Sequence, residues 1–160
     1  MRMRKAQAWG FDMLIAVSLF SMTMLLFYLY SLNRSSETED VLKSLQYDAN
    51  IVAQIVLSEG YPQDWIAANV ITPGILTDKK INQTKIEQFY DLSQNDYEDT
   101  KKLLQTKYDF YIFLSQPIEI TGDTVPGMGR NYTNPKNLIK LTRVTTYQNK
   151  PTTFTIYVWN

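Results

Sequence analysis

An uninterrupted apolar run near the amino terminus constrains this chain more than any other feature. The run extends from Phe11 to Leu32, and its one charged residue, Asp12, lies at its edge. A helix of about 20 apolar residues can cross the roughly 30 Å hydrocarbon core of a bilayer, whereas the apolar part of a secretory signal peptide has about 7–15 residues. We therefore expect a retained transmembrane helix and a protein anchored in the cell membrane.

The charges on either side of the run predict its orientation. Arg2, Arg4 and Lys5 precede it, while the segment from Asn33 to Asp40 carries one basic and three acidic side chains. Basic residues concentrate on the cytoplasmic side of membrane spans, so we expect a cytoplasmic amino terminus and an extracellular domain from Asn33 onward. The alternative is signal-peptidase cleavage after the span, but residues 28–33 offer no pair of suitably spaced small residues.

Residues 33–160 are numerous enough for one domain with its own core. Their composition excludes several classes of function. This part holds 13 of the 16 basic and 15 of the 16 acidic residues, a slightly acidic balance that argues against nucleic acid as a partner. The chain has no cysteine and no histidine. Their absence excludes disulfide bonds, catalytic Ser–His and Cys–His pairs, and ordinary zinc sites. We expect no catalytic residue, no metal and no cofactor.

Apolar residues between Val41 and Leu57 recur at helical spacing on one face. Ser36 and Glu39 are spaced as a capping box, which would start a separate helix after the span. The alternative is one helix that continues without a break. The residues expected to face the core are Val41, Leu42, Leu45, Ala49, Val52, Ala53 and Val56.

Loop composition and two shorter helices are expected next. The segment from Tyr61 to Asp78 contains helix breakers, and Trp65, Val70, Ile71 and Ile75 are its expected core contacts. Asn82 is the predicted N-cap of a second helix, and a third is predicted to start at Ser93 with Asp96 and to reach about Gln105. The expected buried side chains of these two helices are Ile86, Phe89, Tyr90, Leu92, Tyr97, Leu103 and Leu104.

The pattern then changes to that of strands. Tyr108 to Ser115 is short, aromatic and β-branched, and predicts a central strand. Gly122 to Pro135 has loop composition. The segments Asn137–Tyr147 and Thr152–Asn160 both alternate with a period of two, and Gln148–Pro151 is the expected turn between them. The fold class predicted is α+β: a long amino-terminal helix, then a domain with helices packed on an antiparallel sheet of three or four strands.

The amino terminus resembles that of archaeal type IV pilin-like proteins, which carry a class III signal peptide. The resemblance rests on Lys5, Ala6 and Gln7, a basic and a small residue followed by glutamine directly before a long apolar segment. It implies cleavage by prepilin peptidase between Ala6 and Gln7. It also implies three regions: a leader (1–6), a helix (7–32) that spans the bilayer before assembly and packs in the filament core afterwards, and an extracellular domain (33–160).

Asp12 departs from the pattern of the bacterial relatives of this family. Those pilins have glutamate at the fifth mature position, whereas here the fifth residue is Phe11 and Asp12 is sixth. Asp12 is the candidate assembly contact; the alternative is a carboxylate at headgroup depth with no partner. Gly10–Phe11 also resembles a bacterial cleavage point, but cleavage there would leave Ile15 in the position of the glutamate.

Three further groups of residues have both a functional and a structural interpretation. Four acidic residues at 91–99 could ligate calcium, but they lack the calcium-loop pattern and suit a solvated helix start. The aromatic residues at 108–113 could stack on sugars or bases, but alternation places half of them in the core. Glycosylation sequons begin at Asn33, Asn82 and Asn131; Asn131 is the best candidate, because Asn82 has a capping role.

Two classes of function remain. The first is a type IV pilin-like subunit or minor pilin, whose partners are the bilayer, prepilin peptidase and copies of itself or other pilins. The second is a single-pass, membrane-tethered binding or sensor domain that forms no filament. Residues 57–104, with Glu59-Gly60-Tyr61-Pro62 and Trp65, are similar to uncharacterised archaeal proteins with the same amino-terminal segment, a likeness that implies no ligand.

Overall fold

A computed structural model describes the backbone of residues 3–160 and the side chains of residues 9–32 and 39–160. The chain divides into two units, Met1–Asp40 and Val41–Asn160. Helix α1 (Met3–Val56) contributes residues to both. Its backbone is helical through residues 33–38, so of the two alternatives the structure has the uninterrupted helix, and a separate helix capped by Ser36 is wrong.

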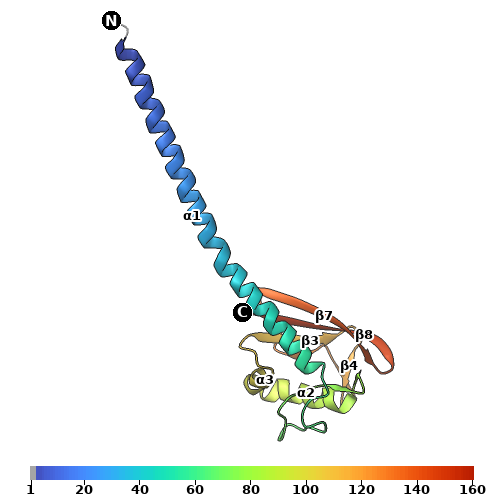
Figure 1. The fold of residues 1–160 in the computed structure, drawn as a ribbon. Coiled ribbons are helices and arrows are strands. Elements are labelled where there is room, and N and C mark those ends of the chain that lie inside the picture. Colours follow the sequence, from blue (N-terminus) through green and yellow to red (C-terminus); the bar gives the residue numbers. More distant parts are fainter. Residues whose placement is uncertain (1–2) are drawn as a thin grey trace. The chain divides into compact units, whose positions relative to one another are not determined.

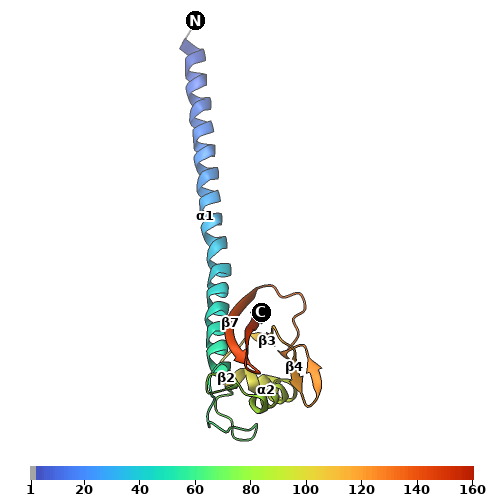
Figure 2. The ribbon, with the colours of Figure 1, turned by 90° about the vertical axis from the view of Figure 1, so that its right-hand side faces the viewer.

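The second unit, which we call the globular unit (Val41–Asn160), contains a four-stranded antiparallel sheet and the helices that cover one face of it. The last turns of α1 lie beside β7 in both ribbon views, and α2 (Gln83–Asn95) and α3 (Tyr97–Leu103) complete the helical layer (Figure 1, Figure 2). The strand order is β6 (Met128–Gly129), β3 (Asp109–Leu114), β8 (Lys150–Trp159), β7 (Leu138–Tyr147). The α+β prediction and the central position of the 108–115 strand are thus confirmed.

The β7–β8 hairpin has a tighter turn than the sequence indicated. Tyr147 pairs with Lys150, and the two residues between them, Gln148 and Asn149, have φ values of 49° and 61°. Two successive positive φ values define the two-residue turn that matches the twist of a hairpin. Lys150 and Pro151 therefore belong to β8, and Pro151 is tolerated because it lies beyond the last residue that pairs with β3.

The core of the globular unit joins three elements. Phe110, Ile112 and their neighbours on β8 alternate inward from the sheet, and they form one buried cluster with α1 and α2. From α1 the cluster takes Leu45, Ala49, Val52, Ala53 and Val56; from α2 it takes Ile86, Phe89 and Leu92. Leu42, expected on the buried face, is 36 % exposed; it lies on the same stripe but precedes Leu45, the first buried residue in the described part of the helix.

The boundaries of the two short helices confirm one prediction and correct another. The Asn82 side chain caps α2 by accepting a hydrogen bond from the Lys85 amide at 3.2 Å. Ser93 does not start a new helix; it is buried in α2, and its hydroxyl donates to the Tyr90 carbonyl. The third helix begins after Asp96, whose side chain makes no capping bond.

Two small hairpins occupy segments that the sequence presented as loops or left unassigned. They are β1–β2 (Leu76–Thr77 and Lys80–Ile81) and β4–β5 (Ile118–Ile120 and Asp123–Val125). Strands of two or three residues are too short to give a periodic signal. In the loop before β1, Trp65 and Ile75 are buried as expected, but Ile71 is 63 % exposed.

Candidate functional site

The segment Trp9–Leu32 of α1 is long and apolar enough to cross a membrane. It contains 24 residues with a mean hydropathy of 2.0, and none of it is buried against the rest of the structure. A helix of this composition in the core of a soluble protein would be covered by neighbouring elements. Its exposure leaves lipid or another protein as the environment that would remove these side chains from water.

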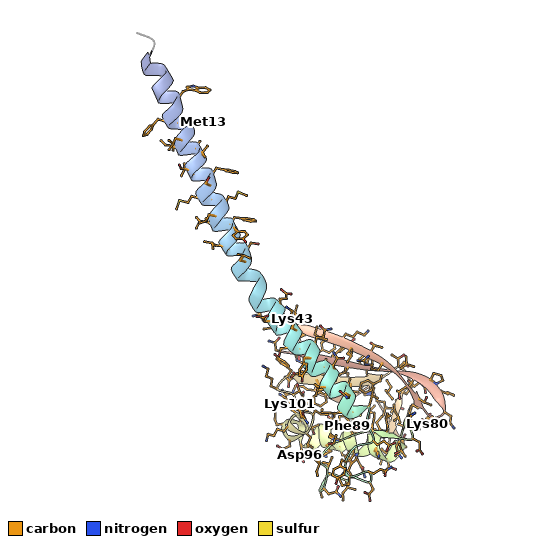
Figure 3. All side chains as sticks on the ribbon, in the orientation of Figure 1. Met13, Lys43, Lys80, Phe89, Asp96 and Lys101 are labelled. Carbon is orange, nitrogen blue, oxygen red and sulfur yellow. The ribbon has the colours of Figure 1, made fainter. Side chains whose placement is uncertain are left out.

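Apolar side chains cover this segment on every side. Residues 24–27 are four consecutive apolar residues, which together make a full turn at 100° each, and their exposed fractions are 56–71 %. Figure 3 shows side chains projecting around the helix along this stretch, Met13 among them. The segment therefore has no single buried stripe of the kind that docks a helix on one partner surface.

Two hydroxyl groups inside the segment, those of Ser18 and Thr23, bond to the backbone of the helix itself. Ser18 donates to the Leu14 carbonyl at 2.8 Å, and Thr23 donates to the Leu19 carbonyl at 2.7 Å. In a bilayer a polar group without a partner costs several kcal/mol (about 4–8 for transfer to an alkane). These back-bonded hydroxyls avoid that cost and are compatible with a lipid environment.

Only part of the predicted amino-terminal site falls within the described side chains. Asp12 is exposed on α1, in the first turns of the apolar segment. The side chains of Lys5, Ala6, Gln7 and Asn33 lie outside the described residues, although the backbone there is helical. The cleavage motif and the first sequon thus remain predictions from the sequence.

The other two sequons lie in very different surroundings. The Asn82 side chain is engaged twice, because it accepts from the Lys85 amide and donates to the Thr77 hydroxyl. Asn131 is exposed in an irregular segment between β6 and β7. The structure thus gives the two asparagines the surroundings that the sequence predicted, a cap and an open loop, while modification of either stays a prediction.

The aromatic stretch around β3 divides between the two faces of the sheet. Phe110 is fully buried on the helical side, whereas Tyr111 and Phe113 are half-buried on the opposite side. There Phe113 meets Tyr157 edge-on at 5.3 Å between ring centroids, and Tyr132 meets the same Tyr157 ring at 5.2 Å. These rings pack on one another, so the stretch acts mainly in packing rather than as an open stacking surface.

Of the four acidic residues at 91–99, Glu98 and Asp99 form ion pairs with nearby cations, and so does Asp109 of β3. Arg130 contacts both Asp109 at 3.3 Å and Glu98 at 3.4 Å, and Lys101 also contacts Asp109 at 3.3 Å. The Tyr97 hydroxyl donates to Asp109 at 3.1 Å. Burial raises the pKa of the Tyr97 phenol, and the charge of Asp109 raises it further. The phenol therefore stays protonated as a donor, in a network that joins α3 to β3.

Sequence reasoning missed a surface pocket of about 420 Å³ between the loop after α1 and the start of α2. Lys85 and Trp65 are its most buried lining residues, at 7 % and 1 % exposed. Helical periodicity placed Lys85 next to the core residue Ile86 but gave no reason to bury its ammonium group. The sequence pointed to two of the lining residues, Asn82 as a cap and Trp65 as a core contact, but not to a pocket between them.

Comparisons with protein-family models, with curated proteins and with solved structures found no match. The function is therefore inferred from the chain's own residues. Two features are available for that inference: an exposed apolar segment that can span a membrane, and a globular unit in which the same helix is packed on an antiparallel sheet.

Proposed function

We propose that this chain is a type IV pilin-like subunit, held in the cell membrane by Trp9–Leu32 before it assembles through α1. The amino terminus lies in the cytoplasm, and residues 33–160 lie outside the cell. The observation that carries the proposal is the change of surroundings along one helix: every residue from Trp9 to Leu32 is exposed, whereas the same helix is buried at Leu45, Ala49 and Val52.

The apolar segment suits both states of such a subunit, the membrane-anchored state and the assembled filament. In the bilayer its side chains face lipid, and the hydroxyls of Ser18 and Thr23 bond to the helix backbone. In a filament the same surface would pack against the corresponding helices of neighbouring subunits, where an apolar surface on all sides allows several neighbours at once. A segment with a single apolar stripe would suit only one neighbour.

The globular unit would remain outside as the exposed part of the subunit. Its core includes the last turns of α1, the helix that also contains the apolar segment. Prepilin peptidase would cut between Ala6 and Gln7 and leave the apolar segment in the mature protein.

The experiment is mass spectrometry of the amino terminus of the native protein extracted from its own membranes. The proposal predicts a mature chain that starts at Gln7, and co-purification of that chain with sheared surface filaments. An Ala6→Phe variant should stay uncut, because the small residue before the cleavage point is lost. Met3→Leu, a change outside the motif, should be cut normally.

The outcomes separate the two classes of function. An intact terminus at Met1 or Arg2, together with absence from filaments, would contradict the proposal and favour a membrane-tethered binding or sensor domain. Cleavage at Gln7 without filaments would keep the anchor and the processing, but would contradict assembly. Both readouts use the full-length chain.

A further inference from the structure

The pocket between the loop after α1 and the start of α2 has a rigid frame. The Trp65 indole donates to the Gly74 carbonyl at 2.8 Å, which fixes the loop wall from within. The loop is closed at its base by backbone bonds between Tyr61 and Thr72. On the other wall, the Asn82 side chain joins the first turn of α2 to Thr77. A pocket held in this way needs little ordering when a ligand binds.

Lys85 holds the two walls together. It is 7 % exposed, and its ammonium donates to the Glu59 carbonyl at 2.6 Å and to the Leu76 carbonyl at 2.9 Å. Within the described part of the chain no carboxylate lies within ion-pair distance of it. An ammonium has three donors, and these two bonds leave the third for another acceptor. Lys85 also lines the pocket, so a bound molecule could supply that acceptor.

Three further groups line the pocket with free hydrogen-bonding capacity. They are the carboxylate of Asp64, the hydroxyl of Thr84 and the amide of Gln88. Among the residues that the structure describes, none of these three side chains has a hydrogen-bond or ion-pair partner. Together with Lys85 they offer both donors and acceptors around one space of about 420 Å³.

The balance of these groups selects a class of ligand. Seven of the eight lining residues carry hydrogen-bonding groups, while apolar atoms make up more of the exposed lining than polar atoms do, so the ligand should have both polar and apolar faces. Asp64 and Lys85 give the lining one negative and one positive group, so the pocket has no net charge to favour an anion or a cation, and a molecule without net charge is favoured. Each hydroxyl of a sugar both donates and accepts, as this mixed set of groups requires. We propose that this pocket binds a neutral sugar residue, with Asp64, Thr84, Lys85 and Gln88 as its hydrogen-bonding partners.

The pocket volume is compatible with such a ligand. Small-molecule sites commonly measure about 300–1,000 Å³, and 420 Å³ lies toward the lower end of that range. The site is a property of the globular unit alone, since all its lining residues lie between Gln63 and Gln88. Sugar binding therefore depends neither on cleavage at Gln7 nor on filament formation, and it goes beyond the proposed function.

The test is ligand-observed saturation-transfer NMR on the full-length chain in phospholipid nanodiscs. Nanodiscs are used because alkyl glycoside detergents would place sugar headgroups in competition with the ligand. The panel is glucose, galactose, mannose and N-acetylglucosamine, with glucuronic acid and glucosamine as charged counterparts. At least one neutral sugar should bind, and more tightly than both charged sugars.

Two pocket variants and two matched controls locate the site. Asp64→Ala and Gln88→Ala should each weaken binding roughly tenfold, because each removes a hydrogen-bonding group. Neither side chain supports the fold through a hydrogen bond, so thermal unfolding should not change. Asp91→Ala and Asn95→Ala, at exposed positions of α2 outside the pocket, should leave affinity unchanged.

Three results would overturn the proposal. The first is that no sugar of the panel binds to the wild-type chain. The second is that Asp64→Ala and Gln88→Ala bind as tightly as the controls, which would place the sugar elsewhere. The third is a preference for glucuronic acid or glucosamine, which would show that one charge of the pocket dominates.

Discussion

The two halves of helix α1 have similar backbones and opposite side-chain patterns. In the segment Trp9–Leu32 apolar residues occur on every side and all are exposed. Between Val41 and Val56 the buried residues are confined to one stripe, and the polar residues Gln46 and Gln54 face solvent. The first half has a composition that requires lipid or many neighbours, and the second has one that requires a single partner surface.

This difference teaches that backbone continuity does not imply a uniform environment. Both halves are helical, but burial against the core of the globular unit is confined to the second half. The stability of the globular unit should therefore depend on residues 41–56 and hardly at all on residues 9–32. Substitutions placed at matched positions in the two halves can test this.

The largest effect is expected from a charge placed in the buried stripe. Ala49 is fully buried, so Ala49→Glu should destabilise the globular unit by about 4 kcal/mol or more, because the carboxylate would lack both water and a partner. Denaturant unfolding followed by tryptophan fluorescence measures this, in a Trp9→Phe background where buried Trp65 and Trp159 provide the signal.

The control for that prediction lies two residues earlier on the same helix. Tyr47 is 67 % exposed, so Tyr47→Glu should change the free energy of unfolding by less than about 0.5 kcal/mol. Equal effects of the two substitutions would mean that residues 41–56 do not pack with one face on the sheet.

A second pair compares the same residue type in the two halves. Leu45 is fully buried, and Leu45→Ala should cost about 2–5 kcal/mol through lost burial and the cavity left behind. Leu25 is 59 % exposed, and Leu25→Ala should leave the unfolding of the globular unit unchanged. A destabilisation by Leu25→Ala would show that the apolar segment also packs on the globular unit.

A third pair uses two glycines. A Cβ at Gly74 would collide with the Gly60 amide and the Ser58 carbonyl, so Gly74→Ala should destabilise by about 1–3 kcal/mol through overpacking. A Cβ at Gly10 meets nothing within 4 Å, so Gly10→Ala should be tolerated. Thermal unfolding of the two variants checks the contrast, and a neutral Gly74→Ala would contradict the tight packing of the loop.

The smallest effect is expected at alkaline pH. Burial raises the pKa of Tyr97, Tyr111 and Tyr147 in the folded state, so the folded chain keeps these protons when the unfolded chain begins to lose them. This stabilisation is complete below about pH 10 and is lost as the pH rises through the folded values. Denaturant midpoints should therefore be constant up to about pH 10 and fall as the pH rises further.

The Tyr97→Phe variant measures how much of the alkaline loss of stability comes from Tyr97 alone. It removes the hydrogen bond to Asp109 and the acceptor of the Phe110 amide at 2.9 Å, which should cost about 1–3 kcal/mol at neutral pH. The variant should also lose less stability than wild type above pH 10. Tyr47→Phe, at an exposed position, is the control, and an alkaline loss that is identical in all three chains would contradict the assignment to Tyr97.

The sequence predicted features that depend on long or repeated patterns. The apolar run, the helical stripe after Val41 and the alternation of β7 and β8 are each long enough to give a period. The Asn82 cap was also predictable, because a capping asparagine acts on the amides of its own first turn. These elements account for the fold class and for the candidate membrane segment.

The sequence could not predict features that depend on contacts between distant segments. The two short hairpins have strands of two or three residues, and the exposure of Ile71 depends on how its loop turns over Trp65. The burial of Lys85 is of the same kind, since its acceptors are carbonyls that lie 26 and 9 residues away in the sequence. Tertiary contacts of this sort produce no repeating pattern in the amino-acid sequence.

Alkaline carbonate extraction of membranes from cells that produce the intact chain tests the central claim most directly, with the mass of the extracted protein measured alongside. A chain that uses Trp9–Leu32 as its anchor should stay in the membrane pellet, with a mass that includes this segment. A soluble protein whose mass corresponds to a start beyond Leu32 would contradict a retained anchor.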